Sequence, residues 1–221
     1  MLQLVPARAD GRPLRLLCLG AHADDIEIGC GGTVMRLLGE RPGTEVTWVV
    51  FSATPERRRE AEATAARFLE PAARRRVEVF DFPDTRFPAA FDSLKDTFAA
   101  IAAGPAPDLI LSHRRADRHQ DHRTVAELTW NAWRDHLILE YEIPKYEGDL
   151  APPNCFVPLD PALAERKVSL LLEGFPSQRD KHWFDAETFR GLLRLRGLEA
   201  GASSGYAEAF HASKLVLGTG A

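Results

Sequence analysis

Ionisable side chains occur together directly after the first apolar segment of the chain. The run from His22 to Asp25 follows the apolar residues 14–20, and the glycine-rich stretch 29–32 comes next. His22 and Asp25 are three residues apart at a predicted turn after a strand, so an imidazole nitrogen and a carboxylate oxygen can approach one cation. Such atoms bind Zn²⁺ at roughly 2.0–2.2 Å. The spacing therefore indicates a divalent metal site.

A second group of ionisable residues lies about a hundred residues later, and it consists of His113, Asp117, His119, Asp121 and His122. His119 and His122 are three residues apart at the start of a predicted helix, which places them on one face. A catalytic zinc ion usually has three protein ligands and one open position for water. His22, Asp25 and one histidine of the second group would supply such a set. Asp24, beside Asp25, could then accept a proton from the attacking water.

The rest of the chain alternates between apolar strand patterns and amphipathic helix patterns. Strands are predicted at residues 14–19, 45–51, 77–82, 108–112 and 139–143, and helices at 33–40, 55–69, 91–102 and 122–136. This order predicts an α/β fold, a Rossmann-like, doubly wound and mostly parallel sheet with helices on both faces. Because ligands bind at the carboxyl ends of such strands, His22, Ser52, Asp84 and His113 are expected to face one crevice.

The pattern changes after Pro144. Loops, an edge strand at 155–158, helices at 160–173 and 185–196 and a closing strand at 213–217 are predicted there. We interpret residues 1–221 as a single domain, with a core at about 12–143 and a C-terminal cap from 144.

The composition excludes several classes of partner. The 221 residues carry a net charge of −4, which disfavours nucleic acid as the main partner. The arginine runs 57–59 and 74–76 are expected on solvated helix faces and helix ends. No apolar run is long enough for a membrane span, and the first residues lack the layout of a signal peptide. The odd number of cysteines, three, fits a reducing cytoplasm.

Two alternatives compete with a metal hydrolase. The glycines at 29, 31 and 32 could form a phosphate loop of a Rossmann-like nucleotide-binding protein, although they do not match G-x-G-x-x-G and Asp24 and Asp25 would repel phosphate. The second alternative is a protein that binds metal without catalysis, or a phosphoester hydrolase. Two-metal phosphoester chemistry needs more ligands than this set offers.

Two motifs resemble those of a known family. Residues 21–33, Ala-His-Ala-Asp-Asp-Ile-Glu-Ile-Gly-Cys-Gly-Gly-Thr, are similar to the first motif of the LmbE-like, or PIG-L, zinc-dependent N-deacetylases, and residues 117–122 resemble the second. Weaker similarities occur at residues 59–63, 81–84 and 206–210. The resemblance implies hydrolysis of acetyl groups from N-acetylglucosamine units and related amides. A small N-acetylated sugar or glycoside would be the substrate.

The resemblance also assigns roles by position. His22, Asp25 and His122 match the zinc ligands, and Asp24 matches the general base. His119 matches the histidine that stabilises the oxyanion. Asp121 is placed to orient that histidine and, if it reaches the ring, to favour the imidazolium form.

Other positions are assigned less specifically. Ala23 departs from the proline usual in the family, which loosens the turn without removing a functional group. Arg59 and Asp84 are expected to contact sugar hydroxyl groups, or else to form a surface salt bridge and cap a loop. His113 either supports the ligands from behind or faces solvent at the end of its strand. The particular acyl substrate and the oligomeric state, including a homo-oligomer, stay open.

Overall fold

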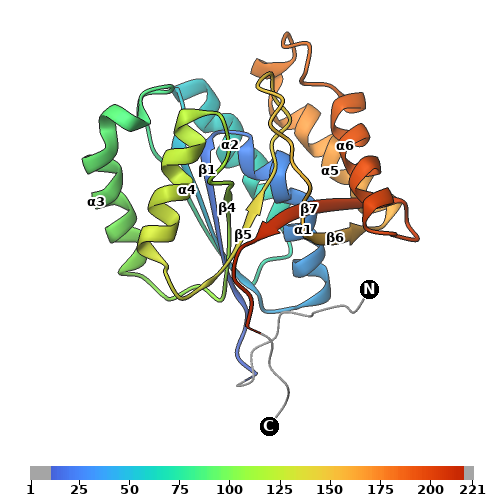
Figure 1. The fold of residues 1–221 in the computed structure, drawn as a ribbon, viewed down its shortest axis with the longest axis horizontal. Coiled ribbons are helices and arrows are strands. Elements are labelled where there is room, and N and C mark those ends of the chain that lie inside the picture. Colours follow the sequence, from blue (N-terminus) through green and yellow to red (C-terminus); the bar gives the residue numbers. More distant parts are fainter. Residues whose placement is uncertain (1–10, 217–221) are drawn as a thin grey trace.

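The computed structural model describes residues 11–216 and contains a seven-stranded sheet in the order β3-β2-β1-β4-β5-β7-β6 (Figure 1). Its strands are β1 (Arg15–His22), β2 (Glu45–Ser52), β3 (Arg74–Val79), β4 (Leu109–His113), β5 (Leu137–Tyr141), β6 (Cys155–Leu159) and β7 (Tyr206–Ala212). The first five strands in sequence are parallel to one another, and β7 pairs antiparallel with both β5 and β6. The prediction of a doubly wound, mostly parallel α/β sheet is confirmed.

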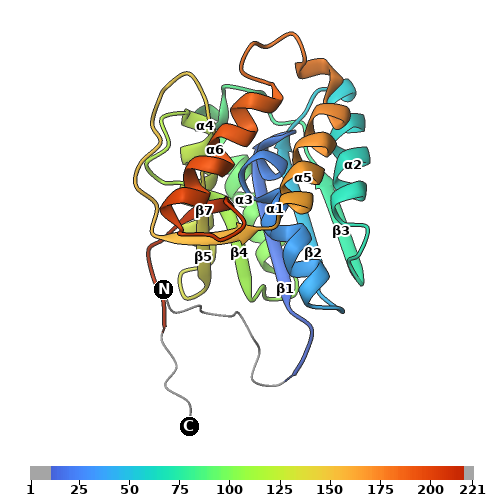
Figure 2. The ribbon, with the colours of Figure 1, turned by 90° about the vertical axis from the view of Figure 1, so that its right-hand side faces the viewer.

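Helices cover both faces of the sheet. They are α1 (Asp25–Glu40), α2 (Pro55–Phe68), α3 (Phe91–Ala102), α4 (Gln120–Ala132), α5 (Pro161–Gly174) and α6 (Ala186–Glu199), with short 3-10 turns at Phe87–Ala90 and Pro176–Gln178. Figure 1 shows α3 and α4 on one side of the sheet and α5 and α6 on the other, and Figure 2 shows α5 in front of α1.

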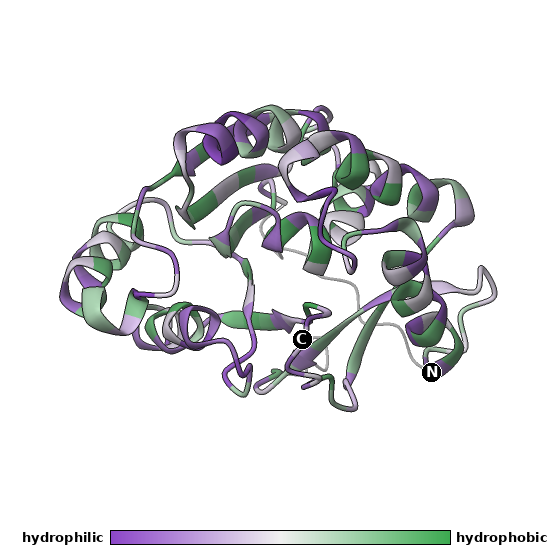
Figure 3. Cartoon of the chain, turned by 90° about the horizontal axis from the view of Figure 1, so that it is seen from above, coloured by the Kyte–Doolittle hydropathy of each residue, from purple (hydrophilic) through white to green (hydrophobic). Residues whose placement is uncertain are grey.

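Alternation along the central strands builds one apolar core on each face. Leu16 and Cys18 of β1 belong to the cluster that includes α1, α2, α5 and α6, whereas Leu17 and Leu19 belong to the cluster with α3 and α4. Successive side chains of a strand point to opposite faces, so a strand buried on both faces has a continuous apolar sequence. Figure 3, seen from above, shows long hydrophobic stretches in the strands between the helices.

The strand order places the expected ligand-binding position of such a fold at the carboxyl end of β1. The chain runs from β1 outward to β2 and β3 and then returns to the other side of β1 to form β4. The order in which strands are added therefore reverses between β1 and β4, and such folds bind their ligands at this point. His22 ends β1 opposite Ser52 of β2, and His113 ends β4 opposite Tyr141 of β5.

Helix α1 begins at Asp25 rather than at Thr33, so the predicted glycine turn was wrong. The glycines lie inside the helix because neighbouring side chains pack directly against its backbone. A Cβ atom at Gly29 would lie 2.2 Å from the ring of Tyr141, and one at Gly31 would lie 2.5 Å from the ring of Phe68. Tertiary packing thus outweighs the low helix propensity of glycine here.

The closing strand is β7 at residues 206–212 rather than 213–217. Residues 213–216 form no strand, and Leu217 lies outside the described residues. The strand was missed because Glu208 interrupts its apolar pattern, although this side chain is buried against charged and backbone partners. The arginine run 74–76, expected on a helix, forms the exposed first half of edge strand β3. Charged residues on an edge strand oppose pairing with other chains.

Between residues 11 and 216, no helix has both the length and the hydropathy that crossing a membrane requires. The cysteines are free: Cys18 and Cys30 are buried, and Cys155 is partly exposed.

Candidate metal and catalytic site

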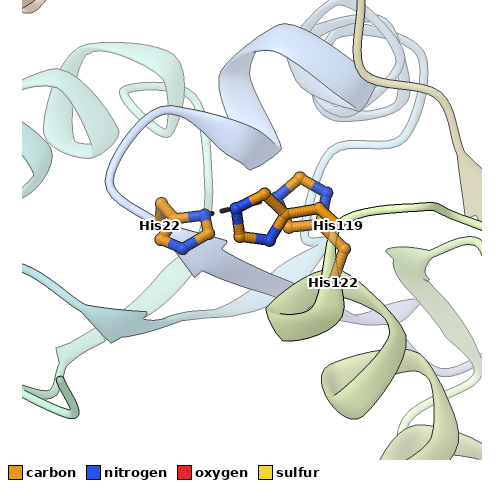
Figure 4. A group of neighbouring side chains, drawn as sticks. All are labelled: His22, His119 and His122. Carbon is orange, nitrogen blue, oxygen red and sulfur yellow. Dashed lines mark hydrogen bonds between the residues drawn. The ribbon is translucent and has the colours of Figure 1, made fainter. Parts of the chain in front are cut away.

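Three side chains from different elements bring ligand atoms together at the end of β1. The Nδ1 atom of His22 lies 3.2 Å from Nε2 of His122, and Asp25 places its carboxylate oxygens 3.4 Å from that Nδ1 and 3.5 Å from that Nε2. Figure 4 shows the two histidines turned toward each other, with His119 beside them. Ligands at about 2.0–2.2 Å from a tetrahedral ion are separated by roughly 3.3–3.6 Å. The three side chains therefore fit one divalent metal ion.

His122 is held by a carboxylate behind it. Its Nδ1 lies 3.1 Å from Oδ2 of Asp117, which also accepts a hydrogen bond of 2.9 Å from Nζ of Lys145. The other oxygen of Asp117 accepts the N–H of His119 at 2.8 Å. Burial opposes ionisation of Asp117, but its bonds to His122 and Lys145 bring its pKa below the usual range. This carboxylate fixes the ring of His122 with Nε2 toward the site, as such partners do for metal ligands.

The surroundings of His122 favour the neutral imidazole, the form that a metal ligand requires. Burial, together with the neighbouring His113, lowers the pKa of His122 to about 4. Burial opposes the charge of Asp25, but its contacts with the neighbouring imidazole rings hold the pKa of that carboxyl well below its usual range. A neutral imidazole and an ionised carboxylate are the forms that bind metal.

His113 lies behind these residues and is fully buried, so the alternative of a solvent-facing histidine is excluded. Its Nε2 accepts the N–H of Ala21 at 2.9 Å and lies 3.2 Å from Asp25 and from the hydroxyl of Tyr141. Its ring stacks on that of His122 with 4.0 Å between centroids. His113 therefore packs directly behind Asp25 and His122, two of the candidate ligands.

Asp24 lies beside Asp25 and is paired with an arginine. Its carboxylate is only 7% exposed and lies 2.9 Å from Nη2 of Arg57 on α2. Burial raises the pKa of Asp24, whereas Arg57 acts in the opposite direction. The buried carboxylate next to the proposed ligands has the position of a general base.

Arg57, not Arg59, reaches the site. Arg59 is exposed on α2. Residues two apart on a helix point about 200° away from each other, so the two arginines face opposite directions. The prediction of a solvated helix face for the arginine run was wrong for Arg57 because the charge of Asp24 holds its guanidinium at the crevice.

Asp121 differs from its predicted placement. Its carboxylate accepts the N–H of Thr85 at 2.7 Å and that of Phe87 at 3.1 Å, and it lies 3.3 Å from Nε2 of His22. The carboxylate thus orients His22 with Nδ1 toward the site, and Asp121 contacts the ring of His119 through its backbone N–H instead. The reason is that the backbone N–H groups of Thr85 and Phe87 hold the buried carboxylate beside His22 at the end of β1.

His119 precedes α4 as its N-cap residue, and its Nδ1 accepts the N–H of Asp121 at 3.3 Å. Burial, together with the neighbouring His22, lowers the pKa of His119, which favours the neutral ring over an imidazolium. A neutral ring that accepts at Nδ1 carries its proton at Nε2. His119 can therefore donate one hydrogen bond into the crevice.

Asp84 lies at the exposed edge of the site. Its Oδ1 is 3.0 Å from Nε2 of His22 while 64% of its side chain is exposed. The hydrogen bond from His22 lowers the pKa of Asp84 to about 2. The next residue, Thr85, has a φ of 64°, a left-handed conformation held by its bond to Asp121. Asp84 is therefore an ionised hydrogen-bond acceptor at the exposed edge of the site.

Sequence reasoning missed three contributors to this site. Arg57 was assigned to a solvent face, Asp117 had no role, and Lys145 was not considered. The position of Asp117, five residues before His122, is the signal that could have identified it, because carboxylates commonly support histidine ligands.

Residues 17–133 match the family model described as PIG-L, GlcNAc-PI de-N-acetylase. The chain belongs to the PIG-L family. The matched segment includes both motifs and runs from β1 to the end of α4. The predicted family is therefore confirmed, and with it membership of a family of deacetylases, which are hydrolases.

Known proteins resemble the chain over most of its length. The "uncharacterized deacetylase YaiS" of Escherichia coli K12 is 29% identical over 141 residues, which cover 58% of this chain and 74% of that protein. The N,N'-diacetylchitobiose deacetylase from Pyrococcus horikoshii has a TM-score of 0.66 and 21% identity over 90% of this chain and 83% of its own. GalB, the 4-carboxy-2-hydroxymuconate hydratase from Pseudomonas putida KT2440, has a TM-score of 0.71 and 18% identity over 94% and 99%. At these identities the two structures show the shared fold, which carries more than one chemistry.

Proposed function

We propose that the chain is a zinc-dependent hydrolase that removes an N-acetyl or related N-acyl group from a small substrate containing an amino sugar. The approach of His22 Nδ1, His122 Nε2 and the Asp25 carboxylate to within 3.2–3.5 Å of one another carries this proposal. Membership of a deacetylase family supports the type of bond that is cleaved.

His22, Asp25 and His122 would hold the metal ion. Their nitrogen and oxygen atoms form the donor set that zinc prefers in catalytic sites. Each residue has a hydrogen-bonded partner that fixes its orientation: Asp121 for His22, the backbone N–H of His22 for Asp25, and Asp117 for His122. A zinc ion bound there supplies Lewis acidity, which polarises an amide carbonyl and makes water more acidic.

Asp24 accepts the proton of the attacking water in this proposal. It is buried beside Asp25, and the guanidinium of Arg57 holds the carboxylate in place. A positioned general base typically contributes about 10²–10⁴-fold to the rate. Because Arg57 also favours the charged carboxylate, its guanidinium helps to keep Asp24 able to accept a proton.

His119 donates a hydrogen bond to the acyl oxygen as negative charge develops there. The support is the neutral ring with its proton on Nε2, half-buried at the N-cap of α4. This modifies the expectation of a charged imidazolium, since the carboxylate of Asp121 contacts His22 and only its backbone N–H contacts His119. The ring of His119 lies 5.0 Å, centroid to centroid, from that of His22, so one substrate oxygen can be near both.

The ionised, exposed Asp84 is the best candidate for a contact with sugar hydroxyl groups, which are hydrogen-bond donors. Arg59 has no comparable position. We also propose a cytoplasmic location, which is supported by the three free cysteines.

A nucleotide-binding function is not favoured. The glycines expected to cradle phosphate lie within α1, where Tyr141 and Phe68 pack on Gly29 and Gly31. The close packing of these rings accounts for glycine at positions 29 and 31, so no phosphate-binding role is needed to explain it.

The test is acetate release from a panel of N-acetylated sugars, including N-acetylglucosamine and N,N'-diacetylchitobiose, by zinc-loaded protein. We expect acetate from at least one sugar and a loss of activity in zinc-loaded Asp24→Asn. Because GalB shares the fold, 4-carboxy-2-hydroxymuconate is included as a second type of substrate. Hydration of that compound without release of acetate from any sugar would contradict the proposal.

A further inference from the structure

Two backbone amides in the interior of α1 donate hydrogen bonds to a side chain from β7. The N–H of Gly32 lies 2.8 Å from Oε1 of Glu208, and the N–H of Thr33 lies 2.6 Å from Oε2. In a regular α-helix, the N–H of residue 32 pairs with the C=O of residue 28. Glu208 thus contacts the donor end of one helical hydrogen bond.

Lys167 contacts the acceptor end of the same bond. Its Nζ donates to the carbonyl oxygen of Ile28 at 2.6 Å and to Oε1 of Glu208 at 2.6 Å. The ion pair therefore links the carbonyl of Ile28 to the amide of Gly32. Lys167 and Glu208 are each only 3% exposed, so both charges are removed from water. A buried ion pair is rarely a net source of stability, which suggests a role in specifying geometry.

The space for this contact depends on glycine at position 32. A Cβ atom there would lie 2.9 Å from Oε1 of Glu208 and 2.5 Å from Leu159. The absence of a side chain lets Glu208 approach the helix backbone. The contact with Glu208 of the C-terminal cap therefore explains why position 32, the last of the glycine run, has no side chain.

The pair connects the cap to the helix that carries the proposed catalytic residues. Lys167 lies on α5 and Glu208 on β7, and both elements pack against α1 (Figure 2). Asp25 is the first residue of α1, and Asp24 precedes it. A shift of α1 along its axis would therefore move both carboxylates relative to His22 and His122, which lie on other elements.

We propose that Glu208 and Lys167 are positioning residues that fix α1 so that Asp24 and Asp25 are correctly placed at the metal site. This inference rests on the proposed function, because it takes Asp25 as a ligand. Changes in partners outside the ligand set typically weaken metal affinity by about 10–100-fold.

The experiment compares Glu208→Gln with the control Glu142→Gln. Glu142 forms an equally buried ion pair with Arg196 of α6, at 2.7 Å and 2.8 Å, and their side chains are 4% and 5% exposed. Both variants lose a buried charge pair, but only the first loses contacts with α1. Zinc affinity is measured by competition with a chromophoric chelator, and the melting temperature is measured on the same metal-free protein.

We expect similar losses of melting temperature in both variants, with zinc affinity about 10–100-fold weaker only in Glu208→Gln. Zinc affinity within about threefold of wild type in a folded Glu208→Gln protein would overturn the inference, as would equal weakening in both variants. If Glu208→Gln does not fold, the double variant Lys167→Met/Glu208→Gln leaves no unpaired buried charge and is tested by the same criterion. Failure of the wild-type chain to bind zinc would contradict the proposed function instead.

Discussion

Substitution of Asp117 by Asn tests whether a carboxylate behind His122 controls metal binding. Asp117 is 3% exposed and has three contacts: His122 Nδ1 at 3.1 Å, Lys145 Nζ at 2.9 Å and the His119 N–H at 2.8 Å. An amide can keep the last bond through its oxygen. Its NH₂ group then faces the Lys145 ammonium and the Nδ1–H of His122, which are both donors.

The size of the effect follows from this mismatch. Loss of the partner of a histidine ligand costs about 10–100-fold in metal affinity, equivalent to about 1.4–2.7 kcal/mol. In Asp117→Asn the new NH₂ group faces two other donors, the Lys145 ammonium and the Nδ1–H of His122. We therefore expect the loss of zinc affinity to lie at the upper end of this range. The assay is a zinc titration of chelator-treated protein, with zinc released to a chromophoric competitor.

Asp149→Asn provides the matched control. One carboxylate oxygen of Asp149 lies 2.8 Å from Nζ of the same Lys145, and the other accepts the N–H of Arg118. Unlike Asp117, Asp149 is not bonded to a proposed metal ligand. We expect a change in zinc affinity below about threefold for this variant. Equal zinc affinity in Asp117→Asn and wild-type protein, with both folded, would refute the reasoning.

Four further predictions concern single residues. Asp24→Asn should keep its zinc and lose about 10²–10⁴ in kcat, and near-normal turnover would exclude it as the base. His119→Ala should keep its zinc and KM while kcat falls about 10²–10³-fold; a lower melting temperature with normal kcat would indicate a structural role only. Gly29→Ala should lower stability by about 1–3 kcal/mol in denaturant titrations, because its Cβ would lie 2.2 Å from the Tyr141 ring. Burial raises the pKa of Glu27 from 4.5 to about 8, so folding favours its neutral acid form. The free energy of unfolding of the metal-free wild-type protein should therefore fall as pH rises from 4.5 toward 8, and that of Glu27→Gln should not show this fall. Parallel plots of unfolding free energy against pH for the two proteins would contradict the assignment.

The central features of the site could be predicted because they are local in sequence. His22 and Asp25 lie at one strand-to-helix junction, and His119 and His122 at another. The carboxyl ends of parallel strands meet at one edge of a sheet, so the two motifs were expected to converge. The geometry agrees with that expectation.

The remaining features depend on contacts between distant segments. Lys145 reaches Asp117 from the loop after β5, and the choice of Arg57 over Arg59 depends on how α2 is rotated relative to β1. Neither can be read from spacing alone. The helical glycines of α1 were misinterpreted because propensity favours a turn, whereas the rings of Tyr141 and Phe68 require a helix surface without side chains.

The most direct test of the account is a zinc titration of the metal-free protein in which acetate release from an N-acetylated sugar is the measured quantity. We predict that activity rises in proportion to zinc and reaches its plateau at one equivalent per chain, the number that His22, Asp25 and His122 can hold together. Full activity in metal-free protein, or no acetate at any ratio of zinc to protein with every sugar of the panel, would contradict a zinc-dependent deacetylase.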